Sequence, residues 1–217
     1  MTDLLPGQAE AIAEVNDLRQ AISKGDPRTL DLILGKAHTH FAWTDRKVDE
    51  TTLRAAFDLA RMGPTSMNCQ PMRLVWVRSA EAKARLIPHM MEGNREKTAK
   101  APVTAIVAHD TAFYTQFGRN FPINPGAAGF FAGNAELAQV TAFRNATLQA
   151  AYLIIALRAH GLDVGGMSGF DNPAVDVEFL GGTTFKSNFL MNVGYGDAGT
   201  VFPRLPRFAF DDVSQIV

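Results

Sequence analysis

Apolar residues recur at helical spacing near the start of the chain, at Ile12, Val15, Leu18 and Ile22. Gly25-Asp26-Pro27 is expected to end this first helix, because glycine and proline both interrupt helical backbone. Leu30 to Leu34 predicts a short second helix that Gly35 closes. The pattern therefore predicts a helical N-terminal arm over residues 1–36.

The next stretch alternates between helical and strand-like patterns. A helix is expected to begin after Asp49, a good N-cap residue, and to stop at Gly63-Pro64. Arg73 to Arg78 alternates and is rich in β-formers, which predicts a strand, and Ala80 to Met90 predicts a helix. Val103 to His109 is apolar throughout and predicts a second strand in the centre of a sheet.

A long helix is predicted from Asn134 to Ala159, since this stretch contains neither glycine nor proline, and Gly161 is placed to cap it. Its large apolar residues spread over much of the helix surface; they are Leu137, Val140, Phe143, Leu148, Tyr152 and Ile155. A helix with so wide an apolar surface needs partners on several sides, and a second subunit is one source of them.

The last third of the chain predicts a glycine-rich turn at Gly165 to Gly169, a short helix at Asn172 to Leu180, a strand at Asn188 to Val193 and an extended tail from Phe202 to Phe210. Strands and helices do not alternate cleanly as βαβ units. We therefore expect one domain, residues 1–217, with an α+β sandwich rather than a doubly wound sheet.

Composition narrows the class of protein. The chain has 217 residues, of which 47% are hydrophobic and 20% charged, which is typical of a globular domain. The net charge of −1 offers no positive field for nucleic acid or anionic lipid. The single cysteine, Cys69, fits a reducing compartment, and the longest apolar run, Ala150 to Leu157, is too short to span a membrane. Met1 to Glu10 lacks a secretion-signal pattern, so a cytoplasmic location is expected.

One motif matches a cofactor pattern without its context. Gly194-Tyr195-Gly196-Asp197-Ala198-Gly199 fits the dinucleotide pattern G-x-G-x-x-G. Pro203 and Pro206 exclude the helix that must follow, and too little chain remains for a βαβ unit. A glycine-rich turn is the better interpretation.

Two other features suggest chemistry but lack partners. His38 and His40 are spaced as H-x-H, but the sequence offers no third metal ligand, so no metal site is predicted. Cys69 has Asn68 and Gln70 beside it and no base, which favours a structural role over that of a nucleophile. No side chain is therefore predicted to be catalytic.

Three segments have the residue types of a cofactor site. Gly63 to Pro71 packs small polar side chains and two amides into one loop, which suits the polar edge of a planar heterocycle, although it also fits an ordinary turn. Glycines in Gly165 to Asp171 allow backbone N–H groups to approach a ligand, or they form a tight turn before an N-cap. Arg204 and Arg207 lie in a proline-stiffened tail and either bind phosphate or lie on the surface.

Taken in order, these segments resemble the nitroreductase family over about Ala37 to Phe208. The likeness is closest to the branch of malonic semialdehyde reductase and of proteins named NADH dehydrogenase/NAD(P)H nitroreductase. The motifs that carry it are Gly63-Pro64-Thr65-Ser66-Met67-Asn68-Cys69-Gln70-Pro71, Ala142-Phe143-Arg144-Asn145-Ala146-Thr147-Leu148-Gln149, Met167-Ser168-Gly169-Phe170-Asp171 and Asn192-Val193-Gly194-Tyr195-Gly196-Asp197, followed by the Arg-x-x-Arg tail.

The resemblance implies a nitroreductase-like sandwich with a mostly antiparallel sheet, an intertwined homodimer and FMN at the subunit interface. The implied FMN-binding residues are His38, Thr39 and His40 with Arg204 and Arg207 at the phosphate, Ser66, Asn68 and Gln70 from the partner's loop at the flavin ring, and Met167, Ser168 and Gly169 beside its N5 edge. NADH or NADPH would supply hydride, and a small acceptor would use the same place in turn, in a ping-pong scheme. The implied acceptors are a small aldehyde acid such as malonic semialdehyde, giving 3-hydroxypropionate, or nitro and quinone compounds.

Two positions depart from the family pattern. His38 stands where the family usually has arginine, and histidine is only partly charged near neutral pH. Gly166 replaces a proline usual in this branch. These departures keep two alternatives open, which are a flavin-binding protein or sensor without turnover and a structural dimer whose cofactor site has decayed.

Overall fold

The computed structural model describes residues 8–22, 26 and 28–217. The chain divides into two compact units, Met1–Ala37 and His38–Val217. In the first unit, α1 (Gln8–Ile22) forms where the first helix was predicted, and the second predicted helix is divided between α2 (Arg28–Leu30) and a π-helical turn, η1 (Asp31–Gly35). Gly25 and Pro27 of the predicted helix stop, like the first seven residues, lie outside the described residues.

The second unit contains the sheet and the remaining helices. Its strands are β1 (Met72–Val77), β2 (Val103–Asp110), β3 (Asp163–Met167) and β4 (Phe185–Gly194). Its α-helices are α3 (Glu50–Ala60), α4 (Ala80–Leu86), α5 (Glu92–Lys100), α6 (Phe117–Asn120), α7 (Ala128–Ala132), α8 (Ala135–Ala159), α9 (Asn172–Leu180) and α10 (Phe210–Val213). Short 3-10 turns are η2 (Ser66–Asn68), η3 (Ile87–His89), η4 (Phe113–Gln116), η5 (Pro125–Ala127) and η6 (Ala198–Thr200).

The sheet has the strand order β1-β2-β4-β3, and every pairing within it is antiparallel. All eight residues of β2 are buried, which confirms that this strand is central. The predicted strand Asn188–Val193 is the inner part of the longer β4. The α+β class with an antiparallel sheet is confirmed.

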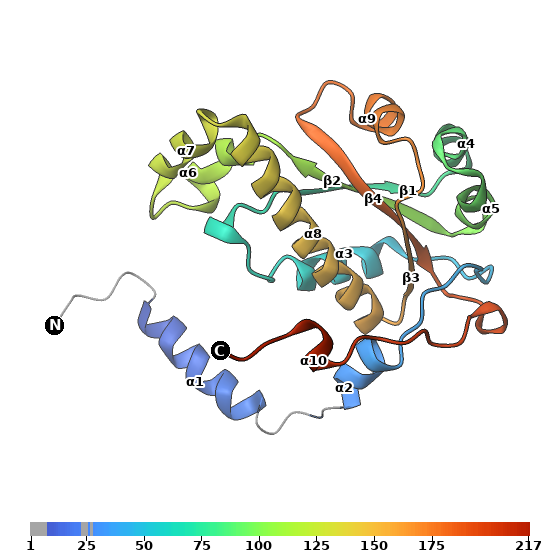
Figure 1. Ribbon diagram of the computed structural model, residues 1–217, viewed down its shortest axis with the longest axis horizontal. Helices are drawn as coiled ribbons and strands as arrows, with labels where there is room; N and C mark the ends of the chain where they lie inside the picture. The colour runs from blue at the N-terminus through green and yellow to red at the C-terminus, as the bar shows by residue number, and fades with distance from the viewer. Residues whose placement is uncertain (1–7, 23–25, 27) are drawn as a thin grey trace. The chain divides into compact units, whose positions relative to one another are not determined.

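Helices cover both faces of this sheet (Figure 1). On one face, α3 and α8 pack against alternate strand residues such as Val103, Ala105 and Val107. On the other face, Ile106 and Leu190 meet Met90 and residues from α4 and α9. Alternation of side chains along each strand therefore builds two separate apolar cores.

The long helix α8 is confirmed, including its ends. The Asn134 side chain accepts a hydrogen bond from Leu137 N at 2.9 Å, and Gly161 follows the helix with φ of 75°, a conformation that glycine adopts without strain. By length and a mean hydropathy of 1.2, α8 would suit a membrane span, but half of that window is buried inside the protein. Its buried residues are mostly alanines, which let the helix lie close to the sheet.

The predicted turn at Gly165 to Gly169 is wrong in its first half. Gly165 and Gly166 lie within β3 and pair with Asn192 and Met191 of β4. Glycine is needed at 165 because a Cβ there would lie 2.4 Å from the His40 carbonyl oxygen. A close approach of two backbones, rather than a chain reversal, explains this glycine.

Helical structure differs from prediction in two other places. The helix predicted over Ala80–Met90 ends at Leu86, and Pro88 lies in the 3-10 turn that follows. The sequence analysis did not foresee α5, α6 and α7, which are short or strongly polar. The tail is without regular structure over residues 201–209, as predicted, before α10 begins.

Candidate functional site

The loop between α3 and β1 has an unusual backbone. Met67, Asn68 and Gln70 have φ values of 53°, 49° and 40°, in the left-handed region that non-glycine residues rarely occupy. Each such residue costs about 1–3 kcal/mol, and the conformation persists only where its surroundings enforce it. Backbone strain of this kind gathers at ligand-binding sites, which supports a functional role for the predicted loop.

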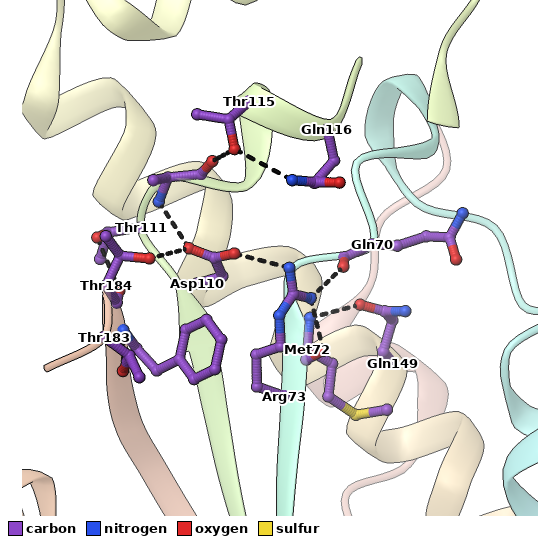
Figure 2. Close-up of polar contacts among 12 residues, drawn as sticks. Gln70, Met72, Arg73, Asp110, Thr111, Thr115, Gln116, Gln149, Thr183 and Thr184 are labelled. Carbon is purple, nitrogen blue, oxygen red and sulfur yellow. Dashed lines mark hydrogen bonds and ion pairs between the residues drawn. The ribbon is translucent and has the colours of Figure 1, made fainter. Parts of the chain in front are cut away.

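A partly buried ion pair supports the end of this loop (Figure 2). Arg73 Nη2 donates to Asp110 Oδ2 at 2.6 Å, and its Nη1 donates to the carbonyl oxygen of Gln70 at 3.0 Å. The other carboxylate oxygen, Asp110 Oδ1, accepts from Thr184 Oγ1 at 2.6 Å and from Ala112 N at 2.9 Å. The loop is thus connected through Arg73 to the ends of β2 and β4.

The three loop residues predicted to meet the flavin differ in what they offer. Asn68 Nδ2 donates to Asn120 O at 2.7 Å, and Asn68 Oδ1 accepts from Gln70 Nε2 at 2.9 Å, so both groups of this exposed side chain already have partners within the chain. Ser66 is exposed, and within the described chain neither its hydroxyl nor the Met67 N–H makes a hydrogen bond. These two donors are available to a ligand.

The second predicted segment, Met167 to Gly169, ends β3. The Met167 side chain is buried, and its sulfur accepts a hydrogen bond from Thr98 Oγ1 at 3.5 Å. The Gly169 carbonyl accepts from Met91 N at 3.0 Å and from Asn94 Nδ2 at 2.8 Å. The N–H groups of Ser168 and Gly169 find no acceptor among the described residues, so this turn offers backbone donors.

The predicted phosphate segment lies beside the same edge strand, because Thr39 forms a parallel bridge with Val164 of β3. His38 is half-buried and makes no hydrogen bond or ion pair with any described residue, and the Thr39 side chain is exposed. His40 differs, since its Nε2 lies 3.3 Å from Asp163 Oδ1 and its side chain is only 11% exposed. Of this segment, His38 and Thr39 are free to bind an anion, whereas His40 is engaged with Asp163.

The G-x-G-x-x-G sequence serves packing around His40. A Cβ on Gly196 would lie 1.9 Å from His40 Nδ1, and a Cβ on Gly194 would lie 2.7 Å from Pro102 Cδ. The Gly196 N–H donates to Asp163 Oδ2 at 2.9 Å, so one carboxylate holds both His40 and Gly196. These contacts explain Gly194 and Gly196 without a dinucleotide.

The C-terminal tail begins close to the phosphate segment, since the rings of Phe202 and Phe41 lie 5.5 Å apart. Arg207 is exposed, and its Nη1 donates to the Leu205 carbonyl at 2.9 Å. Arg204 repels Arg158, whose pKa is lowered mainly by burial.

The sequence analysis missed two cations near this segment. Lys97 lies over the Phe41 ring, with its Nζ 5.2 Å from the ring centre, and Arg158 interacts with Asp163 beside His40. Neither lies in a motif. Only the tertiary contacts reveal them.

One chain does not bring all the predicted site residues together. The loop 66–70 precedes β1, and Met167 and Thr39 belong to the opposite edge of the sheet, beside β3. Three strand spacings of about 4.8 Å separate these edges, roughly 14 Å in all. In register, Met72 is level with His109 and Lys186, whereas Val164 is level with Val193 and Val103 at the other end of the strands. The loop and the phosphate segment therefore lie at diagonally opposite corners of the sheet.

One groove in the described chain contains none of the predicted site residues. It measures about 810 Å³ and lies between α3 and β1, where it is lined by Leu53, Phe57, Leu74 and Trp76 together with charged residues such as Arg73. The outer edge of β1 pairs with no strand in the described residues. The groove therefore follows an open sheet edge.

In the described residues, no three His, Cys, Asp or Glu side chains lie close enough together to hold a metal ion.

Cys69 is expected to react very slowly with alkylating reagents in the folded protein. The residue is 1% exposed, and burial raises the pKa of its thiol to about 11. At pH 8 only about one thiol in a thousand is then ionised, so labelling by iodoacetamide is expected to be roughly 100-fold slower than in the denatured chain. Mass spectrometry of native and denatured samples measures this ratio, and equal rates would contradict the buried structural role.

Comparisons with known proteins agree with this architecture. The chain is 54% identical over 187 residues to a Burkholderia lata protein provisionally named NADH dehydrogenase/NAD(P)H nitroreductase, covering 86% of this chain and 95% of that protein. A Streptococcus pneumoniae nitroreductase family protein shares the fold with a TM-score of 0.76 and 24% identity, covering 85% of this chain and 98% of that one. A provisionally named nitroreductase from Exiguobacterium sibiricum, solved in complex with FMN, has a TM-score of 0.77 and 19% identity, covering 87% of this chain and 97% of that one.

The sequence model of the nitroreductase family matches residues 38–195, well over half of the chain. This range contains the whole sheet and the segments that supply the free donors. The chain belongs to the nitroreductase family.

Proposed function

We propose that this protein is an FMN-dependent oxidoreductase that passes hydride from NADH or NADPH to a small acceptor. One observation carries the proposal: two segments that resemble the nitroreductase family contain hydrogen-bond donors without a partner in the described chain. These donors are the Ser66 hydroxyl, the Met67 N–H and the N–H groups of Ser168 and Gly169. Backbone and hydroxyl donors of this kind orient a flavin ring and adjust its electronics. The 54% identical relative, whose name includes NAD(P)H nitroreductase, supports the same activity.

The residues present fit FMN, although His38 replaces the usual arginine. His38 and Thr39 would meet the phosphate, and Arg204 and Arg207 belong to the tail that begins beside Phe41. Lys97, over the Phe41 ring, adds a cation that offsets the partial charge of His38. His40 and Met167 would support this site from behind, since both side chains are engaged inside the protein.

In this mechanism, FMN supplies the hydride-accepting and hydride-donating ring. The protein binds and orients the reactants, and its apolar walls exclude water. No side-chain acid is required by the arrangement. Because NAD(P)H and the acceptor would use one place in turn, initial-rate plots are expected to give parallel lines.

We also propose that the working unit is a homodimer in which each site uses both chains. Opposite corners of the sheet hold the two halves of the site, so a second copy is needed to bring a loop 66–70 to a segment 38–40. The outward residues of α8 are 41–47% exposed and apolar; they are Leu137, Val140, Phe143 and Leu148. These exposed apolar side chains and the open groove beside β1 favour burial against a partner. A reducing cytoplasmic location fits the single buried thiol.

For the acceptor, we propose a small aldehyde acid such as malonic semialdehyde, with nitro and quinone compounds as the other candidates. Arg119 is exposed and makes no hydrogen bond or ion pair within the described chain, and it adjoins Asn120, whose carbonyl accepts from Asn68. A guanidinium so close in sequence to the loop is suited to a carboxylate. Steady-state assays of all three acceptors on one preparation decide between them, and absence of aldehyde turnover would remove the first.

The visible absorption spectrum of the purified protein tests the whole proposal. Flavin bands, present on isolation or after addition of FMN, are expected to bleach with anaerobic NADH or NADPH. Bound FMN that neither nucleotide reduces would favour a flavin-binding sensor. Failure to bind added FMN would overturn the proposal and leave a structural dimer as the better account.

A further inference from the structure

Three side chains of α8 contact the loop between α3 and β1 from behind. They are Asn145, Gln149 and Tyr152, whose spacing of four and then three residues places them on one face of the helix. Asn145 Oδ1 accepts from Ser66 N at 2.9 Å, and Gln149 Oε1 accepts from Met72 N at 2.9 Å (Figure 2 shows the Gln149 contact). We call these three residues the α8 stripe.

The third member of the stripe fixes the start of the loop. Tyr152 Oη donates to the Pro64 carbonyl at 3.3 Å. A Cβ on Gly63 would lie 2.1 Å from the Tyr152 ring, so the chain passes directly against this ring. The α8 stripe therefore holds the loop at its start, at Ser66 and where β1 begins.

The two amides are costly to place inside the protein. Asn145 is 5% exposed and Gln149 is 4% exposed, whereas the other buried residues of α8 are alanines and leucines. A buried amide destabilises the fold unless its hydrogen bonds are made. Asn145 makes two, since its Nδ2 also donates to Thr141 O at 2.9 Å, and this second bond turns Oδ1 toward Ser66.

These bonds determine which loop groups face outward. The Ser66 N–H is taken by Asn145, Asn68 N donates to Thr65 O at 3.1 Å, and Gln70 N donates to Thr65 Oγ1 at 3.2 Å. The Ser66 hydroxyl and the Met67 N–H are among the loop donors that make no hydrogen bond in the described chain. The left-handed φ of Met67 is a strained conformation that persists only where its surroundings enforce it, and the bond from Ser66 N to Asn145 Oδ1 is one such constraint.

We propose that Asn145 and Gln149 are positioning residues for the flavin, which fix the strained loop so that Ser66 and the Met67 N–H meet the cofactor. This inference rests on the proposed function. Neither amide touches the cofactor in this scheme. Their effect passes through the loop, as outer residues orient the groups that bind a cofactor directly.

The test uses variants that keep the branching or the length of the side chain and remove the acceptor, Asn145→Leu and Gln149→Met. The matched control is Thr147→Ala, on the same helix, which loses a 2.8 Å bond to Phe143 O and a 2.8 Å bond from Asn188 Nδ2 without touching the loop. Amide hydrogen-exchange rates of the apoprotein measure how firmly the loop is held when no flavin is bound. Ser66 is expected to exchange at least about 10-fold faster in Asn145→Leu, and Met72 likewise in Gln149→Met, with β2 unchanged.

The second readout is the flavin itself. The dissociation constant for FMN, from quenching of its fluorescence, is expected to rise about 10- to 100-fold in either variant and to stay unchanged in Thr147→Ala. The midpoint potential of bound FMN is expected to become more negative, since misplaced donors no longer stabilise its reduced form. Asn145→Asp keeps an acceptor for Ser66 N but loses the donor to Thr141 O, so it is expected to restore only part of the affinity, and a loss of packing alone would allow no such recovery.

Unchanged amide exchange in both variants would overturn the inference, and so would faster exchange with unchanged FMN affinity and potential. Thermal unfolding of each apoprotein identifies variants that do not fold. If Asn145→Leu is one of them, Gln149→Met provides the test instead. A wild-type protein that binds no FMN would reject the proposed function and the cofactor half of this inference together. The exchange data would still decide whether the α8 stripe holds the loop.

Discussion

Replacement of Asp110 by alanine is expected to lower the free energy of unfolding by about 3–5 kcal/mol, because it leaves a largely buried arginine without its counter-charge. The Asp110 and Arg73 side chains are 8% and 28% exposed. The carboxylate also accepts from Thr184 and from Ala112 N, so the substitution leaves three donors unpaired at once. Urea denaturation followed by circular dichroism measures the change.

An exposed ion pair provides the control for this experiment. Glu50 and Arg54 form an i, i+4 pair on α3 with side chains 59% and 74% exposed, and Glu50→Gln is expected to change stability by at most about 0.5 kcal/mol. Asp110→Asn, which keeps an acceptor, is expected to fall between the two. If Asp110→Ala cost no more than Glu50→Gln, the Arg73–Asp110 pair would not support the loop as described.

Alanine at Gly165 is expected to weaken FMN binding at least about 10-fold and to cost about 1–3 kcal/mol of stability, whereas alanine at Gly166 is expected to do neither. Both glycines lie in β3 without positive φ, so the backbone itself accepts alanine at either position. The difference is steric. A Cβ at 165 meets the His40 carbonyl oxygen at 2.4 Å, and a Cβ at 166 meets nothing within 4 Å.

The clash at Gly165 acts on the phosphate segment, because relief requires the backbone at His40 to move away from β3. His38 and Thr39 would move with it, and in the proposed site FMN would lose its phosphate contacts. Fluorescence titration with FMN and thermal unfolding measure the two effects, with Gly166→Ala as the matched control. Equal behaviour of the two variants would show that segment 38–40 is not positioned by its contact with β3.

Periodicity and capping residues predicted the parts of the fold whose cause is local. Asn134 and Gly161 delimit α8 because one accepts from the first turn and the other adopts positive φ. Local patterns failed where a distant segment decided the outcome. The glycines at 165 and 166 suggested a turn, yet Gly165 is explained by a backbone more than a hundred residues away.

The candidate site shows the same difference between features with a local cause and features set by distant segments. Ordered motifs located the segments of the candidate site, since their residue types and order lie in the sequence itself. Pairings such as His40 with Asp163, or Ser66 N with Asn145, join residues 79 or more positions apart, and no spacing rule predicts them. Lys97 belongs to no motif and was found only through its contact with Phe41.

Because the His40 ring lies against Gly196, a substitution at either position is expected to constrain which residues the other can accept. No side chain fits at 196 while the imidazole occupies that space, and a smaller residue at 40 would leave a hole beside the Asp163 carboxylate. Drift at one position therefore requires compensation at the other, as between any two coupled sites. A chimera that exchanges the segment around 40 between relatives must carry the segment around 196 with it.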